Sequence, residues 1–367
     1  MHLAVIQDIP TPHNNVLLAA AAADKDTQLT LWYCTPHAAK YDFKADLANA
    51  IQPARFYSPR LPDLKFLLWC LCQPRDVRFL IVGWMNINTR LLMLLFWLLR
   101  RPYNVWFDLP QDDTPRSLPK KLLRNFFYGV LKTSRAHVFC VGHMTVEAFK
   151  AREFSPDRLT NLPIFVDITE DKATFGNAIP GMRKKYGATD AHLLLSTGSR
   201  LVHDKGYDVF VAALALLSPE ERTRIKAVLI GKGPEEEALK AQAEEADLGD
   251  LLTFEGWMEF EDFKALIAAS DLFIHPARFD AFGGTIFAHT LGTPVIGSVG
   301  AGAALDRVQH GVNGWLYEAD SPEAMVAHIR HAFAHQDSLA AMSLAARATA
   351  EAWSPEHGVK IIKDESI

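Results

Sequence analysis

A loop that carries an arginine and a lysine follows an apolar segment in the second half of the chain. In GSRLVHDKGYD (198–208) the apolar strand ends at Ser199, and Arg200 and Lys205 follow it. Ligands bind at the carboxyl ends of strands in open α/β sheets. Two cations beside a helix start suit a diphosphate, because they offset negative charge on a leaving group without a metal. The alternative is an ordinary solvated loop.

A glycine-rich turn lies further along, in HPARFDAFGGTIFAHTLGTPVIGS (275–298). Here Phe282-Gly283-Gly284-Thr285 opens a predicted helix, and glycine allows close approach of the backbone to a ligand. Free amides at a helix start can cradle a phosphate. Asp280, just before the turn, could accept hydrogen bonds from hydroxyl groups, or it could simply cap the helix.

Two more strand-to-helix turns point toward the same sheet edge. Gly231 and Lys232 follow the apolar run KAVLI, and Trp257 follows LLTFEG. An exposed indole can stack on a nucleobase, although an aromatic residue after a strand more often packs against the neighbouring helix.

Short apolar strands alternate with amphipathic helices in both halves of the chain. Such alternation favours parallel, doubly wound sheets with helices on both faces. The polar, Gly/Pro-punctuated stretch 169–181 is typical of a linker. The sequence therefore predicts an α/β protein with two Rossmann-like domains, at 1–170 and 181–353. In the first half the predicted strands are HLAVIQ (2–7), QLTLWYC (28–34), VRFLIVGW (77–84), YNVWFD (103–108) and AHVFCVG (136–142).

Composition excludes some classes of function. The first 180 residues are net basic and the rest are net acidic, with a total charge of −5, so the chain lacks the dense positive field that duplex nucleic acid requires. The four cysteines have no zinc-site spacing and suit a reduced cytoplasmic protein. The first residues, MHLAVIQDIP, indicate a buried strand rather than a signal peptide.

Several short motifs in order make the chain resemble the retaining GT-B glycosyltransferases related to bacterial mannosyl- and lipopolysaccharide-glucosyltransferases. The motifs are GSRLVHDKG, LIGKGPEEEALK, FEGWM, HPARFDAFGG and HGVNGWLYEADSPEAM. The resemblance implies a GT-B fold with two facing Rossmann-like domains, the second of which binds the donor nucleotide. It also implies that the segment 354–367 crosses back to complete the first domain.

The resemblance implies roles for individual residues. The expected catalytic residues are Asp108, Arg200, Lys205 and Asp280. The expected donor-binding residues are Gly198, Ser199, Arg200, Lys205, Gly231, Lys232, Trp257, Phe282, Gly283, Gly284 and Thr285. The family usually has a second acidic residue after the one at Asp280. In this chain the expected position holds Ala288 when counted from Asp280 and Phe287 when counted from Gly292, so the second carboxylate is missing. His289 and Thr290 are nearby polar candidates to replace it.

On the acceptor side, Asp108 ends a predicted strand and could orient or deprotonate an attacking hydroxyl. A capping or turn role is the equal alternative. Asp112 and Asp113 do not form the D-x-D pattern of metal-dependent transferases, so we expect no metal and no cofactor. The family's amino-terminal glycine pair is absent, and His13, Asn14 and Asn15 stand in that loop.

Two basic, aromatic segments, 54–69 and 115–135, could rest on an anionic membrane surface, or each could form one buried and one solvated helix face.

The resulting prediction is a cytoplasmic, peripheral enzyme that moves a sugar from a UDP- or GDP-linked donor to a lipid-linked saccharide acceptor. The alternatives are a catalytically impaired scaffold that only binds its ligands, or a sugar-nucleotide epimerase.

Overall fold

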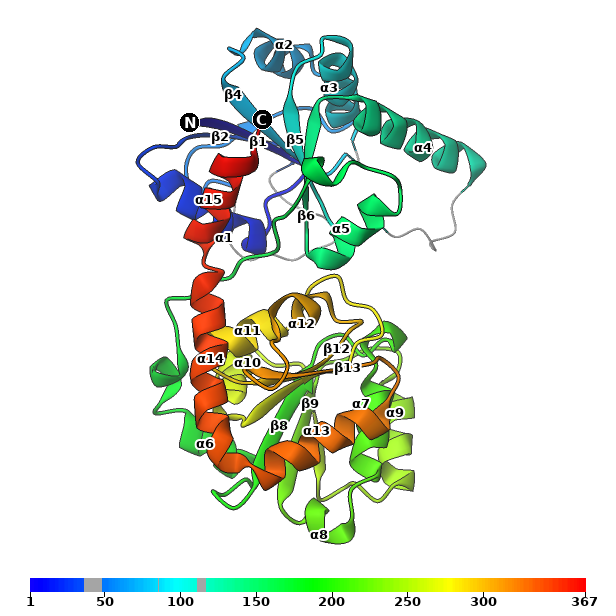
Figure 1. Cartoon of the computed structure of the whole chain (residues 1–367), viewed down its shortest axis with the longest axis vertical. Helices are drawn as coiled ribbons and strands as arrows, with labels where there is room; N and C mark the ends of the chain where they lie inside the picture. Colours follow the sequence, from blue (N-terminus) through cyan, green and yellow to red (C-terminus); the bar gives the residue numbers. More distant parts are fainter. Residues whose placement is uncertain (36–47, 85, 111–116) are drawn as a thin grey trace. The chain divides into compact units, whose positions relative to one another are not determined.

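The computed structural model describes residues 1–35, 48–84, 86–110 and 117–367. The chain divides into two compact units, shown in Figure 1. Unit 1 is Met1–Val166 together with Pro355–Ile367, and unit 2 is Asp167–Ser354. Each unit has its own sheet and its own apolar core.

Unit 1 is built on a seven-stranded parallel sheet in the order β3-β2-β1-β4-β5-β6-β7. Its strands are β1 (His2–Gln7), β2 (Gln28–Tyr33), β3 (Arg55–Phe56), β4 (Val77–Val82), β5 (Tyr103–Phe107), β6 (Ala136–Cys140) and β7 (Leu159–Asn161). Its helices are α1 (Pro12–Ala23), α2 (Leu64–Cys72), α3 (Ile87–Leu98), α4 (Leu118–Thr133), α5 (His143–Lys150), η1 (Pro156–Arg158) and α15 (Pro355–Glu365). The sheet order reverses between β1 and β4, and that reversal defines the ligand crevice of a doubly wound sheet.

The carboxyl-terminal helix α15 packs closely on α1 within unit 1. A Cβ atom on Gly358 would lie 2.6 Å from the ring of Phe165 and 2.7 Å from the side chain of Leu17, so only glycine fits at that contact. Lys363 Nζ also lies 2.9 Å from Asp24 Oδ2. The last turn of the chain is therefore part of the first unit.

Unit 2 is built on a six-stranded parallel sheet in the order β10-β9-β8-β11-β12-β13. Its strands are β8 (Leu193–Gly198), β9 (Ile225–Ile230), β10 (Leu252–Gly256), β11 (Leu272–His275), β12 (Val295–Ser298) and β13 (Gly314–Tyr317). Its helices are η2 (Lys172–Phe175), α6 (Ile179–Lys185), η3 (His203–Lys205), α7 (Tyr207–Ala215), α8 (Pro219–Arg222), α9 (Glu236–Glu245), α10 (Phe260–Ala269), α11 (Thr285–Thr290), α12 (Gly302–Arg307), α13 (Pro322–Ala334), η4 (Gln336–Ser338) and α14 (Leu339–Ala352).

The stretch 169–181, expected as a linker, lies on unit 2 instead of between the units. Phe175 is buried in an apolar cluster with residues of α10 and α11. Glu170 pairs with Lys264 at 2.5 Å. The aromatic side chain and the ion pair give this polar stretch a fixed place, so the division falls between Val166 and Asp167.

These two parallel sheets confirm the predicted α/β architecture of two Rossmann-like units. Over the described ranges, no helix combines the length and apolar character that crossing a bilayer would need.

Candidate active site

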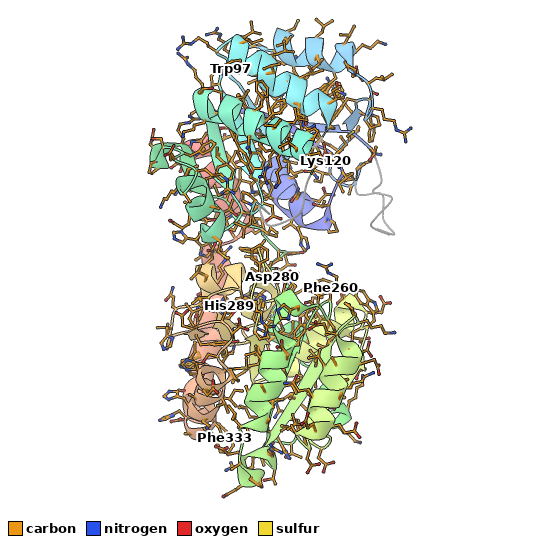
Figure 2. The ribbon with its side chains drawn as sticks, turned by 90° about the vertical axis from the view of Figure 1, so that its right-hand side faces the viewer. Trp97, Lys120, Phe260, Asp280, His289 and Phe333 are labelled. Carbon is orange, nitrogen blue, oxygen red and sulfur yellow. The ribbon has the colours of Figure 1, made fainter. Side chains whose placement is uncertain are left out.

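The candidate site lies at the carboxyl-terminal edge of the sheet in unit 2. Strands β8 and β11 are neighbours at the centre of that sheet, and the strand order reverses between them. The loops that follow these two strands contain the arginine and lysine of 198–208 and the aspartate and glycines of 275–298. Figure 2 shows Asp280 at one end of unit 2, opposite the end where Phe333 lies.

Backbone contacts hold these two loops together. The amide of Phe279 donates to the carbonyl oxygen of Asp204 at 3.0 Å. Gly206 has a φ of +66°, and a Cβ there would lie 2.1 Å from the carbonyl oxygen of Pro276. Glycine is therefore required at the point where the lysine-bearing loop crosses the second loop.

An arginine strengthens the same junction with three ion-pair contacts. Arg278 donates through Nη1 and Nη2 to the two carboxylate oxygens of Asp208, at 2.7 and 2.6 Å. Its Nε lies 2.5 Å from Asp320 Oδ1. Burial opposes ionisation of Asp208, but the hydrogen bonds and charge of Arg278 outweigh it and lower the pKa of Asp208. The junction is thus a charged clamp that positions the loops.

A chain of polar side chains runs through the centre of the site. Lys205 Nζ lies 2.6 Å from Asp280 Oδ2, and His275 Nε2 lies 3.2 Å from the same oxygen. His275 Nδ1 is 2.8 Å from Thr285 Oγ1. The side chains of Lys205 and Asp280 are only 14% and 12% exposed, so their pairing is weakly screened by water.

Asp280 stays ionised in this partly dry setting. Burial alone would raise the pKa of Asp280, but the hydrogen bond and charge of His275 and the charge of Lys205 lower it below its ordinary value. Asp280 does not cap the helix that follows, because the N-cap of α11 is Gly284, without a side-chain hydrogen bond. The capping alternative for Asp280 therefore does not hold.

The glycine pair allows the backbone to pass directly over this polar chain. A Cβ at Gly283 would lie 2.6 Å from Asp280 Oδ2 and 2.7 Å from His275 Cε1. A Cβ at Gly284 would lie 2.5 Å from the ring of Phe273. Within the described residues, the amides of Gly283, Gly284 and Thr285 donate no hydrogen bond to other protein groups. These donors remain available beside Lys205.

The structure brings some of the other predicted donor-binding residues to the same edge. Ser199 Oγ lies 2.6 Å from the hydroxyl of Tyr207, next to the site, while Gly198 ends β8. Gly231 approaches the carbonyl oxygen of Ser199 so closely that a Cβ would lie 1.8 Å away. Gly231 therefore has a structural reason to be glycine, in addition to any contact with a ligand.

The remaining donor-side residues differ in exposure. Trp257 follows β10 and is 75% exposed, so most of this residue faces solvent. Arg200 and Lys232 are also exposed, whereas Phe282 is buried. Of the two predicted cations, only Lys205 is thus held by the protein at the centre of the site.

The position of the missing second carboxylate is filled by apolar groups. Ala288 is buried in the core of unit 2, and Phe287 lies against Phe260 with a centroid separation of 5.2 Å. His289 is almost completely buried, and burial lowers its pKa to about 3. Thr290 donates its hydroxyl to the carbonyl of Ile286 in its own helix. The two polar candidates therefore turn inward and do not replace the acid.

In unit 1, Asp108 follows β5 and is exposed, and its Oδ1 accepts from the amide of Leu109 at 2.8 Å. Asp112 and Asp113 lie outside the described residues. The side-chain amide of Asn14 donates through Nδ2 to Gln7 Oε1 at 3.1 Å. Within the described part of the chain, no group of three or more His, Cys, Asp or Glu side chains is placed to hold a metal ion.

Sequence reasoning missed His275 and the Asp208–Arg278 clamp. The available signal for His275 was a polar residue at the last position of a buried strand, five residues before Asp280. The clamp gave no such signal, because Asp208 and Arg278 are 70 residues apart in the chain.

Comparisons with known proteins match the second unit most closely. Residues 180–349 match the model of the family described as glycosyl transferases group 1. A GDP-mannose-dependent alpha-(1-6)-phosphatidylinositol monomannoside mannosyltransferase of Mycobacterium tuberculosis is 30% identical over 177 residues, which cover 45% of this chain and 44% of the relative. The lipopolysaccharide core biosynthesis mannosyltransferase LpsB of Rhizobium meliloti is 32% identical over 151 residues, covering 39% of this chain and 42% of the relative.

Solved structures are similar over nearly the whole chain. Anabaena Alr3699/HepE in complex with UDP has a TM-score of 0.75 at 19% identity, with 99% of both chains covered. WaaG, a glycosyltransferase involved in lipopolysaccharide biosynthesis, has a TM-score of 0.59 at 16% identity, with 98% of this chain and 99% of WaaG covered. At these identities the likeness concerns the fold. The sequence matches, by contrast, span less than half the length of the curated relatives.

The matched segment, 180–349, contains the loops that follow β8 and β11 and the polar chain from Lys205 to Thr285. The likeness to the solved structures of HepE and WaaG covers 99% and 98% of this chain, so it includes both units. The chain thus has the GT-B fold, and residues 180–349 of its second unit match the model of the glycosyl transferases group 1 family.

Proposed function

We propose that this chain transfers a sugar from a nucleoside diphosphate donor to a saccharide acceptor. The observation that carries the proposal is the largely buried Lys205–Asp280 pair beside the unpaired amides of Gly283 and Gly284. This arrangement provides a cation and neutral donors for a diphosphate, and a carboxylate for hydroxyl groups of the sugar. In the transfer, the bond from the anomeric carbon to the diphosphate breaks and a bond to the acceptor oxygen forms. The proton of the acceptor hydroxyl leaves with the diphosphate.

Leaving-group assistance is the main chemical task that we assign to this site. Negative charge grows on the diphosphate as the sugar departs, and Lys205 and the backbone amides are fixed before the reaction. We propose that these groups do the work without a metal, with Arg200 adding charge from the loop. We also propose retention of the anomeric configuration, following the resemblance to retaining enzymes.

The donor base and the acceptor class are proposed from the relatives. One solved neighbour is a complex with UDP, and the mycobacterial relative is named as GDP-mannose-dependent. We expect a UDP- or GDP-linked sugar whose base stacks on the exposed indole of Trp257. Relatives named for phosphatidylinositol mannosides and lipopolysaccharide core support a lipid-linked saccharide acceptor in surface polysaccharide assembly.

A nucleotide-sugar screen tests the proposal. A nucleotide sugar at 100 times its dissociation constant should stabilise the folded chain by about 2.7 kcal/mol. The effect is measured as a rise in the thermal unfolding midpoint across a panel of UDP- and GDP-linked sugars, with AMP as the control. The same panel is then assayed for release of UDP or GDP with and without a mixture of membrane-extracted glycolipids.

The outcomes separate the alternatives. Nucleotide release that depends on the glycolipid extract supports transfer. Conversion of the donor sugar without release indicates an epimerase. Stabilisation by nucleotide sugars without any turnover indicates an impaired scaffold. The structural reason to consider a scaffold is the apolar Phe287–Phe260 contact, which stands in place of the second acid.

We further propose that unit 1 rests on the inner face of the cytoplasmic membrane through α4. The first turns of this helix are exposed, and Figure 1 shows it extending from the side of unit 1. Leu118, Leu122 and Phe126 are exposed and four residues apart, so they lie along one side of the helix. Lys120, labelled in Figure 2, and Lys121 are exposed on the same turns, and helical spacing places them away from that stripe.

The pattern of side chains on this helix favours binding to an anionic lipid surface. An apolar stripe flanked by lysines can insert between acyl chains while the ammonium groups stay at the anionic headgroups. Each lysine or arginine near such a surface contributes about 1 kcal/mol. Leu64 and Leu68, which are also exposed one turn apart on α2, present a second apolar site on unit 1.

Replacing Leu122 and Phe126 together by glutamate should weaken binding to anionic vesicles at least about tenfold, because each buried apolar side chain contributes roughly 1.5–3 kcal/mol. Co-sedimentation with phosphatidylglycerol-containing and neutral phosphatidylcholine vesicles, at low and high salt, measures the effect. Leu344→Glu is the matched control, because Leu344 is a 75% exposed leucine on a helix of unit 2. Equal, negligible sedimentation of the unmodified chain with both vesicle types contradicts membrane attachment.

A further inference from the structure

A second polar cluster lies at the carboxyl-terminal edge of the sheet in unit 1. Asp8 directly follows β1, and Asn86 begins α3, the helix after β4. These two strands are neighbours, and the strand order of the sheet reverses between them. A doubly wound sheet offers its ligand crevice at this point. The sequence alone drew attention to Asp108 instead, one strand further along the sheet.

The protein holds the Asp8 carboxylate in a defined orientation. Asn86 donates through Nδ2 to Asp8 Oδ1, and the hydroxyl of Tyr57 lies 3.4 Å from the same oxygen. Asn86 is itself fixed, because its Oδ1 accepts from the amide of Thr89 at 2.9 Å as the N-cap of α3. Tyr57 is buried and stacks on Phe66 with a centroid separation of 4.5 Å.

The backbone of Asp8 is fixed as well. Its carbonyl oxygen accepts from the amides of Cys34 and Thr35, both at 3.1 Å, just beyond β2. The side chain of Gln7 braces the loop that follows through Asn14, at 3.1 Å. Asn86 and Tyr57 therefore hold the carboxylate itself, while contacts from the segment after β2 and from α1 fix the backbone and the residue beside it.

One oxygen of this carboxylate remains available. Among the described residues, all hydrogen bonds to the Asp8 side chain go to Oδ1. Oδ2 is not among the buried side-chain atoms that lack a partner, so it reaches solvent. Burial raises the pKa of Asp8, and the hydrogen bonds from Asn86 and Tyr57 only partly offset this. A half-buried, oriented carboxylate with one free oxygen is a strong acceptor for a hydroxyl hydrogen bond.

We infer that Asp8 Oδ2 binds and orients a hydroxyl group of the saccharide acceptor. This inference rests on the proposed function, since it takes unit 1 to be the acceptor side. It differs from the first expectation, because Asp108 is exposed and accepts at Oδ1 from the adjacent backbone amide. Asn86 and Tyr57 act as positioning residues that aim the carboxylate of Asp8.

The test measures binding of simple acceptor analogues to the full chain. Methyl α-mannoside, methyl α-glucoside and methyl α-galactoside are titrated by saturation-transfer-difference NMR, which needs no turnover. Asp8→Asn should bind the preferred glycoside about tenfold more weakly, because it loses a hydrogen bond to a charged group. Asp76→Asn is the matched control, since Asp76 is an exposed aspartate at the opposite edge of the same sheet, just before β4.

Two further readouts keep a folding defect and a donor defect apart from this result. Tyr57→Phe removes one of the contacts to Asp8 and should weaken glycoside binding less than Asp8→Asn does. UDP or GDP should raise the unfolding midpoint of Asp8→Asn as much as it does for the unmodified chain. Glycoside binding that is absent from the unmodified chain, unchanged in Asp8→Asn, or lost in Asp108→Asn alone overturns the inference. A chain that binds glycosides through Asp8 but no nucleotide sugar leaves the inference standing and contradicts the donor proposal.

Discussion

Replacing Lys205 by alanine should lower the rate of nucleotide release by about 10²–10³-fold, the usual cost of losing one preorganised group that stabilises developing negative charge. Lys205 is the cation that the fold holds at the centre of the site, 2.6 Å from Asp280. We expect the loss mainly in kcat, because the charge on the diphosphate grows as the sugar departs. Steady-state release of UDP or GDP measures it.

Lys240→Ala is the control for this experiment. Lys240 is an exposed lysine of the same unit. It pairs with Glu236 at 2.7 Å within α9 and does not belong to the loops that follow β8 and β11. Its removal should leave release within about threefold, since exposed ion pairs contribute roughly 0–1 kcal/mol. A Lys205→Ala chain that folds and releases nucleotide as fast as the Lys240→Ala chain would remove Lys205 from the mechanism.

Replacing Asp280 by asparagine should slow transfer by about 100-fold while binding of the free nucleoside diphosphate is kept or strengthened. In the protein without nucleotide, the ammonium group of Lys205 pairs with the carboxylate of Asp280. With a neutral asparagine there, the charge of Lys205 is free to pair with the diphosphate. Transfer suffers because the carboxylate that we assign to the sugar hydroxyls is gone. Calorimetric titration with UDP and GDP, beside turnover of the nucleotide sugar, separates the two effects.

The same substitution should lower the free energy of unfolding by about 3 kcal/mol, because it leaves Lys205 and His275 beside a neutral amide in a poorly hydrated site. The pKa of Asp280 is lowered in the folded chain, so its stabilising contribution is present above the ordinary value of 3.8 and is lost as the pH falls through the folded pKa. The difference in stability between the two chains should therefore shrink as the pH falls through the folded pKa of Asp280. Asp250→Asn is the control, because Asp250 is an exposed aspartate just before β10, at the opposite edge of the same sheet. Weaker nucleotide binding by Asp280→Asn together with unchanged turnover would contradict this role.

The strands could be predicted because their signal is local. Apolar runs such as 2–7 and 193–198 are buried on both faces of a parallel sheet, and they appear in the structure at those positions. The Lys205–Asp280 pair could not be predicted in the same way. Each residue was identified from its own loop, but their contact depends on the crossing at Gly206, where the two loops meet.

The stretch 169–181 shows the opposite error. Its polar and Gly/Pro-rich character is typical of a linker, yet the burial of one side chain, Phe175, places it on unit 2. His289 was considered for a ligand contact because of its type, but side-chain direction within a short helix decides the outcome, and it points into the core. Residue type alone does not reveal these directions.

Asp8 and Asp108 illustrate how a crevice is missed in a sequence. Asp108 attracts attention because two more aspartates follow it, whereas Asp8 stands alone in its loop. Only the strand order shows that Asp8 directly follows the strand at the reversal of the sheet. The hydrogen bond from Asn86, 78 positions away, then marks it as an oriented group.

A crystal structure of the chain with UDP or GDP bound tests the donor site most directly. We expect the diphosphate within hydrogen-bond distance of Lys205 Nζ and of the amides of Gly283 and Gly284, with the base on the Trp257 side of the sheet edge. A nucleotide found elsewhere on the chain, with Lys205 still closed onto Asp280 and the glycine amides facing only water, would contradict the donor site proposed for unit 2.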